Sequence, residues 1–275
     1  MIEAKEGCAV SGRQETLARI SYQRFFRRYL RPAGMTGTAR EMARELWSVY
    51  RLNVVSVPTN RPLRRGALAD RVFATSEQKW KAIVVRVREL HQQGRPVLVG
   101  TRSVAASEHL SHLLNDEGLH HRVLNARQDQ EEADIIARAG EPGRITVATN
   151  MAGRGTDIKL AEGVADAGGL HVLATERHEA RRIDRQLFGR GGRQGDPGTY
   201  QSMVSLEDEL AKDFYGERLT GWLTRAHRFT PGWVSKCFVS VAQSAAERRH
   251  ARMRRELLKM DEQVGDMLAF TGRAE

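Results

Sequence analysis

The sequence has little cysteine and no long apolar run. Its two cysteines, Cys8 and Cys237, lie far apart among 275 residues and in no metal-binding spacing, which disfavours a disulfide framework or a zinc site. No apolar stretch approaches the roughly 20 residues that cross a bilayer. The opening segment, MIEAKEGC, lacks the apolar core of a signal peptide. We therefore expect a cytoplasmic protein with no signal peptide, no transmembrane segment and no metal site of its own.

The sequence also lacks the motifs that cradle a nucleotide phosphate. No GxxxxGK[ST] segment occurs, and no paired acidic motif follows a strand-like segment. The first would supply a backbone nest and a lysine for the β- and γ-phosphates, and the second would hold magnesium. Aromatic residues make up only 6% of the chain. Because nucleic-acid surfaces use aromatic side chains as stacking platforms, this composition disfavours a nucleic-acid partner.

Positive charge, by contrast, is abundant. The chain carries 44 lysines and arginines against 34 acidic residues, which gives a net charge of +10. Such a balance favours phosphate-bearing partners, namely nucleotides, nucleic acid or anionic lipid head groups, without choosing among them.

From Val54 onwards, strand-like and helical segments alternate. Strands are expected at 54–58 and 95–101 and in later apolar runs; a helix is expected from a Ser76 N-cap to a stop at Gly94. This alternation predicts an α/β fold with a parallel sheet flanked by helices. After residue 207 the pattern turns helical and ends in a long helix from about Ser235 to Leu268. This helix has an apolar stripe that comprises Val241, Met253, Leu257, Met260 and Val264. The stripe implies that another domain or chain covers the helix, or else that its end is frayed and exposed.

The most specific chemistry lies between Ile145 and Gly198. The segment RRIDRQLFGRGGRQGDPG places Gln186, Arg190 and Arg193 on one face if it is helical. Two guanidinium groups on one face form a fork for phosphate oxygens, although an arginine-rich helix can also be a solvated surface.

Three glycines beside these arginines, Gly189, Gly191 and Gly192, argue against a plain surface helix, since each would weaken a helix interior. They suggest a backbone that approaches a ligand or another domain. In the other half, ITVATNMAGRGTDI, Asp157 ends a glycine loop. It could accept from a ribose hydroxyl, pair with an arginine or bond its own backbone. His171, within GLHVL, is interpreted as a core strand residue.

Together these segments resemble the SecA family of bacterial protein-translocation ATPases, which belong to the helicase-like superfamily 2. The blocks that carry the resemblance are ATNMAGRGTDIKL, GGLHVLATERHEARRIDRQL and GRGGRQGDPG, with EAKEGCAV, GMTGTA, VPTNRP, PVLVGTRSV and VLNA in the family's order. The family implies two RecA-like lobes that clamp ATP between them. This sequence differs from the family's pattern at Phe188, where the family usually has an arginine, and at QDQEEAD, which lacks the family's usual histidine.

The resemblance assigns roles to individual residues. Arg190 and Arg193 would be arginine fingers on the γ-phosphate, with Gln186 in the same motif. Asp157, Arg154, Gly153 and Gly155 would contact ATP from the second lobe. Thr36 and Thr38, in GMTGTA, would couple hydrolysis to lobe movement. The implied cofactor is ATP with Mg²⁺, whose ligands are expected outside this chain.

The resemblance also divides the chain. Residues 1–53 would end the first lobe, 54–210 form the second, 211–234 connect, and 235–275 begin a helical scaffold. The phosphate loop and acidic motif of the first lobe would then lie outside this sequence.

The expected function is the second-lobe half of a motor that moves secretory preproteins through a SecYEG-type channel. Such a chain would lie at the inner face of the plasma membrane, where its partners would be the first lobe or the full-length motor and an anionic lipid surface. Two alternatives stay open. One is a nucleic-acid-stimulated helicase-like lobe, and the other is a non-catalytic, truncated interaction module.

Overall fold

The computed structural model describes residues 20–124, 134–149 and 156–271, with side chains up to residue 263. Two compact units emerge from the contacts within the chain. The larger comprises Gly37–Glu41 and Val55–His250, and the smaller comprises Met1–Thr36, Met42–Val54 and Ala251–Glu275.

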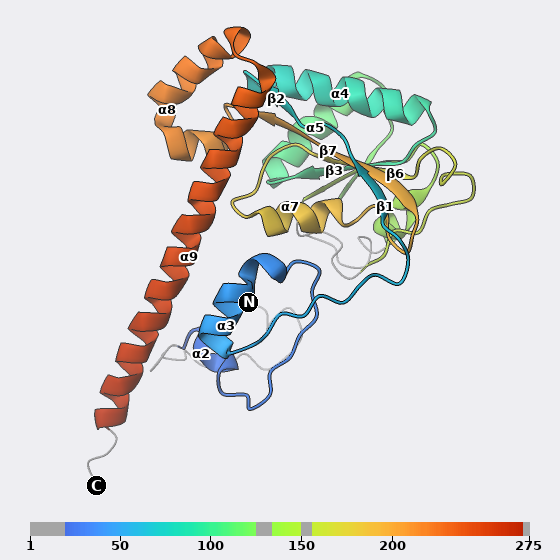
Figure 1. Ribbon diagram of the computed structural model, residues 1–275. Coiled ribbons are helices and arrows are strands. Elements are labelled where there is room, and N and C mark those ends of the chain that lie inside the picture. Colours follow the sequence, from blue (N-terminus) through green and yellow to red (C-terminus); the bar gives the residue numbers. More distant parts are fainter. Residues whose placement is uncertain (1–19, 125–133, 150–155, 272–275) are drawn as a thin grey trace, which may run out of the picture. The chain divides into compact units, whose positions relative to one another are not determined.

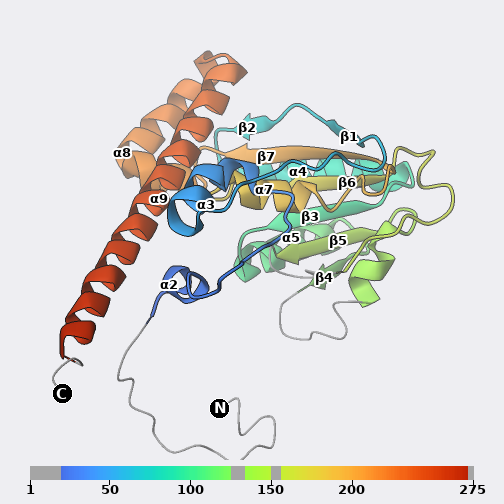
Figure 2. The ribbon, with the colours of Figure 1, turned by 60° about the horizontal axis from the view of Figure 1, so that its bottom comes forward.

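A parallel sheet forms the centre of the larger unit. Seven strands of the described residues join it in the order β1-β7-β6-β3-β5-β4, with β2 also paired to β7. Figure 2 shows them side by side, from β4 at one edge to β1 and β2 at the other. The strands are β1 (Arg64–Ala67), β2 (Arg71–Phe73), β3 (Val97–Thr101), β4 (Arg122–Leu124), β5 (Ile145–Thr149), β6 (Leu170–Ala174) and β7 (Pro197–Ser205).

Helices cover both faces of this sheet (Figure 1). Helices α4 (Ser76–Gln92) and α5 (Val104–Asp116) bury Ile83, Leu90 and Leu110 against one face. The segment ending in η2 (Arg138–Gly140) and helix α7 (Arg181–Phe188) cover the other, where Leu98 and Val172 lie. Because alternate strand residues point to opposite faces, a strand buried on both sides reads as one apolar run. The expected α/β class is confirmed.

Local sequence explains most element boundaries. Helix α4 is capped by Thr75, whose hydroxyl accepts from the amide of Gln78, so the predicted cap at Ser76 was one residue late. It ends before Gly94, which has a φ of +70° as expected for a glycine stop. The strand predicted at 54–58 is wrong. These residues form no regular structure, and Val55 and Val57 are exposed.

His171 lies in β6 with no exposed surface, as expected of a core strand residue. Its Nδ1 lies 2.7 Å from the Thr199 hydroxyl oxygen. Burial lowers its pKa from 6.5 to about 3, and the nearby guanidinium groups of Arg86 and Arg95 add to the effect. The imidazole is therefore neutral in the folded chain at physiological pH.

The last two helices complete the chain. Helix α8 (Glu209–Ala226) has a break at Gly216, where φ is +72°. Helix α9 spans Gly232–Thr271, three residues longer at each end than predicted. Its first turns belong to the larger unit, where Val239 packs with Val204, Leu206 and Leu223. The predicted long C-terminal helix is therefore confirmed.

The rest of α9 belongs to the smaller unit with α2 (Tyr22–Phe26) and α3 (Ala43–Tyr50). Polar contacts hold these helices together. Arg254 donates to both oxygens of Glu45 at 2.7 and 2.8 Å, and the Ser21 hydroxyl donates to Asp261 at 2.6 Å. The stripe residues with described side chains are about half exposed: Val241, Met253, Leu257 and Met260. Among the described helices, none is long and apolar enough to cross a membrane.

Candidate nucleotide site

The two predicted finger arginines do not lie on helix α7. The helix ends at Phe188, and Arg190 and Arg193 follow in residues 189–196, here called the finger loop, which lead into β7. Three loop residues have positive φ, namely Gly192 (64°), Gln194 (53°) and Gly195 (86°). A helix cannot continue through such conformations. The prediction that Gln186, Arg190 and Arg193 share one helix face was therefore wrong.

The glycines of the finger loop allow it to pack on this chain's own sheet. A Cβ atom at Gly192 would lie 2.7 Å from Cβ of Arg65 in β1. One at Gly191 would lie 3.1 Å from a methyl carbon of Val172 in β6. The sequence argument expected a ligand or another domain here. The structure instead puts β1 and β6 of the same unit against the loop.

The finger loop meets the segment that contains Asp157. The Asp157 carboxylate lies 2.8 Å from Nη1 of Arg193, whose Nε donates to the Gly189 carbonyl at 2.8 Å. Arg190 donates to the Thr156 carbonyl at 3.4 Å. Of the possibilities weighed for Asp157, the arginine pair is the one that forms. Both partners of the pair remain partly exposed, at 46% for Asp157 and 37% for Arg193.

A cavity of about 550 Å³ opens beside this ion pair. Three arginines line it, Arg61, Arg65 and Arg193, with Asp157 as the carboxylate. Such a set can donate to phosphate oxygens through the guanidinium groups and accept from a hydroxyl through the carboxylate. The full lining is Thr59, Asn60, Arg61, Pro62, Leu63, Arg65, Asp157, Gly192, Arg193, Gln194 and Gly195.

Other predicted site residues lie elsewhere. Gln186 is exposed on α7 and does not line the cavity. Thr36 is exposed in the smaller unit, and Thr38 is half-buried in a turn of the larger one. Arg154, Gly153 and Gly155 lie outside the described residues. Within the described part of the chain, no group of three or more histidine, cysteine, aspartate or glutamate side chains is placed to hold a metal ion.

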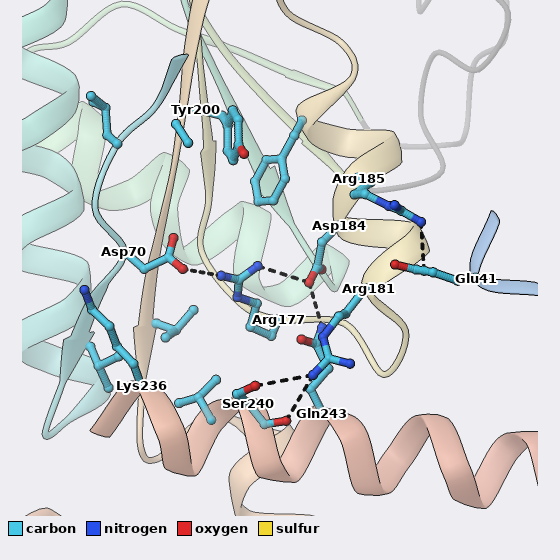
Figure 3. Close-up of a pocket in the computed structure, with 16 residues that line it drawn as sticks. Glu41, Asp70, Arg177, Arg181, Asp184, Arg185, Tyr200, Lys236, Ser240 and Gln243 are labelled. Atoms are coloured by element: carbon cyan, nitrogen blue, oxygen red, sulfur yellow. Dashed lines mark hydrogen bonds and ion pairs between the residues drawn. The ribbon is translucent and has the colours of Figure 1, made fainter. Parts of the chain in front are cut away.

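A second cavity, of about 450 Å³, lies between α7, the β1–β2 segment and the first turns of α9 (Figure 3). A chain of charges crosses it. Arg177 donates to Asp70 at 2.5 Å and to Asp184 at 3.3 Å. At its rim, Arg185 lies 2.8 Å from Glu41. Sequence patterns did not single out Asp70, Arg177 or Asp184, because these residues belong to no recognisable motif, and the Asp70–Arg177 pair joins positions 107 residues apart.

Asp184 is the centre of a buried network that joins α7 to α9. Its carboxylate accepts from the backbone amide and lies 2.7 Å from Nδ1 of His178. It also accepts at 2.7 Å from the amide of Gln243, a buried residue of α9 that donates to the His178 carbonyl as well. Together with Arg177, these partners give both carboxylate oxygens of Asp184 hydrogen-bond donors, as a buried charge requires.

Glu247 of α9 caps the start of α7. Ala180 precedes the helix and offers no side-chain cap. The Glu247 carboxylate instead accepts from the amide of Arg181 at 2.7 Å and from its guanidinium at 2.8 Å. A carboxylate at a helix N-terminus also complements the helix dipole. Helix α7, which leads into the finger loop, is therefore fixed to α9 at its first turn.

Phe188 fills the position where the resemblance expects an arginine. Its side chain is 6% exposed and stacks on Tyr200, with ring centroids 4.4 Å apart. The Arg177 guanidinium lies 5.9 Å from its ring centroid. Phe188, which ends α7, is therefore part of the apolar lining of the second cavity and does not line the cavity beside Asp157 and Arg193.

Comparison with known proteins places the chain in a family. The model of the SecA P-loop domain matches residues 62–163 and 161–228, together more than half of the chain. The model of the SecA DEAD-like domain matches residues 2–47. Among solved structures, the E. coli DEAD-box protein SrmB bound to regulator of ribonuclease activity A superposes with a TM-score of 0.41 and 24% identity. That superposition covers 56% of this chain and 84% of the other.

Curated relatives match along the whole sequence. Protein translocase subunit SecA 2 of Nitrosospira multiformis is 53% identical over 277 residues, and subunit SecA 3 of Magnetococcus marinus is 54% identical over 279. Each alignment covers 100% of this chain and 42% of the relative. The chain thus spans less than half the length of these relatives. On the match to the family model, it belongs to the SecA family.

Proposed function

We propose that this chain forms the second nucleotide-binding lobe of an ATP-driven protein-translocation motor. The observation that carries the proposal is the convergence of Asp157 and Arg193 at the edge of one cavity. Two segments that are separate in the sequence thereby present a carboxylate and guanidinium groups to the same space. That combination suits the ribose and phosphate parts of a nucleotide.

Some of these residues would stabilise charge on the phosphates, and others would orient the nucleotide. Arg190 and Arg193 would stabilise the negative charge that develops on the transferred phosphoryl group. Asp157 would accept from a ribose hydroxyl, and Arg154, Gly153 and Gly155 would complete that contact. Arg193 would exchange the Asp157 carboxylate for a phosphate oxygen when nucleotide binds. Gln186 would support the fingers from the last turn of α7.

The remaining parts of the site would come from elsewhere. ATP supplies the transferable phosphoryl group when bound, and the ligands of its Mg²⁺ would lie outside this chain, in a first lobe. Thr36 and Thr38 would couple hydrolysis to movement of the lobes. This division is consistent with a sequence that contains no GxxxxGK[ST] motif.

The proposed partners follow from the family. The relatives are named protein translocase subunits, and by analogy this chain would act on secretory preproteins at a SecYEG-type channel. Its net charge of +10 would suit an anionic lipid surface at the cytoplasmic face of the membrane.

Nucleotide binding tests the site. The chain, supplied with a first lobe that contains the phosphate loop, should bind a fluorescent ATP analogue. Asp157→Ala should weaken that binding roughly 10- to 150-fold, since a hydrogen-bonded charged contact contributes on the order of 1.5–3 kcal/mol. Asp166→Ala, an exposed carboxylate that does not line the cavity, is the matched control. Equal affinity of the two variants would contradict the proposed role of Asp157.

A further inference from the structure

We propose that Arg61 and Arg65 are positioning residues that hold the finger loop in the shape that presents Arg193. Arg61 lies in the segment just before the sheet, and Arg65 lies in its edge strand β1. That they shape this loop follows from the geometry alone. That the shape matters for turnover rests on the proposed function.

The two arginines donate hydrogen bonds to backbone carbonyls of the finger loop on both sides of Arg193. Arg65 donates from Nη1 to the Gly191 carbonyl at 3.1 Å, and Arg61 donates from Nη1 to the Gln194 carbonyl at 3.2 Å. Arg193 lies between these two carbonyls in the sequence. The backbone that carries Arg193 is therefore held by two charge-assisted hydrogen bonds, one to the carbonyl of Gly191 and one to the carbonyl of Gln194.

Close packing reinforces both contacts. The space for a Cβ atom at Gly192 is taken by Cβ of Arg65, at 2.7 Å, and that at Gly195 by Cβ and Cδ of Arg61, at 3.1 Å. The stems of the arginines thus lie directly on the glycines of the loop. The same side chains that bond the carbonyls also fix how closely the loop can approach the connector and β1.

The loop needs such support because its backbone is strained. Gln194, which unlike glycine carries a Cβ atom, has a φ of +53° and lies between two glycines of positive φ, Gly192 and Gly195. Such conformations persist only when the surroundings hold them. Arg65 itself is well fixed, since it pairs in register with Gly198 across β1 and β7 and its guanidinium lies over the Tyr200 ring. Arg65 therefore anchors the finger loop to a fixed position on the edge of the sheet.

Hydrogen exchange in the full chain tests the contacts directly. The amides of Gly191 and Asp196 are hydrogen-bonded within this region, to Phe188 and Arg193. In Arg61→Ala and Arg65→Ala, exchange across residues 189–196 should accelerate about tenfold while the central strands are unchanged. Arg64→Ala, an exposed arginine on the same strand, should leave it unaltered. Unaltered exchange in both alanine variants would overturn the proposal.

Turnover separates positioning from direct contact with nucleotide. With a first lobe supplied, each alanine variant should lose roughly tenfold in kcat with KM within about twofold, because small misplacements of catalytic groups are costly. Arg61→Lys and Arg65→Lys, which keep a donor, should recover part of the loss. Weakened nucleotide affinity with normal exchange would instead make these residues direct ligands. If Arg193→Ala left turnover intact, the proposed function would fail while the exchange result would still decide the positioning role.

Discussion

Asp157 and Arg193 are separated by 36 residues and form an ion pair at 2.8 Å in the cavity that they line together with Arg61 and Arg65. The pair joins the segment after β5 to the loop after α7. Both side chains are partly exposed, so the pair can open at little cost in free energy. If the chain binds nucleotide as proposed, a phosphate oxygen would replace the Asp157 carboxylate as the partner of Arg193.

Asp157→Asn should have little effect on the stability of the fold but should weaken nucleotide binding. Because exposed ion pairs contribute at most about 1 kcal/mol, the free energy of unfolding should change by no more than that amount. Nucleotide affinity of the two-lobed assembly should nevertheless fall, since the amide no longer offers a charged acceptor. Urea denaturation and nucleotide titration measure the two quantities. A loss of several kcal/mol in stability with normal affinity would show that the pair is structural instead.

Gln243→Ala should destabilise the larger unit by about 1–3 kcal/mol, because it leaves the buried Asp184 carboxylate and the His178 carbonyl each short of a donor. Chemical denaturation monitored by circular dichroism gives the value. Ser240→Ala, an exposed position one turn earlier on α9, should cost less than half as much. Equal effects of the two changes would show that the buried amide is not the stabilising element.

Much of the fold was predictable because its signals are local. The runs at 97–101, 145–149 and 170–174 are buried strands of a parallel sheet, and glycine and hydroxyl residues mark most helix ends. The short edge strands β1 and β2 were missed. RRGA and RVF have no apolar run, and they become strands only because β7 offers them a free edge.

Of the predicted site residues, Asp157 and Arg193 meet in the structure, but the geometry that brings them together was not predicted. Motif spacing selected Asp157, Arg190 and Arg193. The end of α7 was not foreseen, because it depends on close packing of Gly191 and Gly192 against β6 and β1. Arg61 and Arg65 were missed for the same reason, since they act through backbone carbonyls that no sequence pattern identifies.

His171 should make stability depend on pH. The unfolded chain takes up this proton below about pH 6.5 and the folded chain only near pH 3, so the folded state loses stability as pH falls through that window. The contribution of His171 should decrease by up to about 1.4 kcal/mol per pH unit. His171→Gln removes the titration, and the gap in unfolding free energy between wild type and variant should narrow from pH 7 to pH 4. A constant gap would contradict the buried, neutral imidazole.

Phe188→Arg, which restores the residue that the SecA resemblance expects, should destabilise the chain. The buried phenylalanine stacks on Tyr200, and loss of a buried aromatic costs about 3–5 kcal/mol. A guanidinium there would also meet the charge of Arg177. Phe188→Leu should cost less, because it keeps an apolar side chain. Thermal denaturation compares the variants, and wild-type stability of Phe188→Arg would show that the cavity accommodates an arginine.

ATP turnover of the two-lobed assembly tests the central claim most directly. The chain alone should show no hydrolysis above background, since its sequence lacks a phosphate loop. Addition of a SecA first lobe should produce turnover that secretory preprotein stimulates, and Arg190→Ala or Arg193→Ala should reduce it by about 10³-fold or more. Hydrolysis by the chain alone, full turnover without either arginine, or stimulation by RNA in place of preprotein would contradict the account.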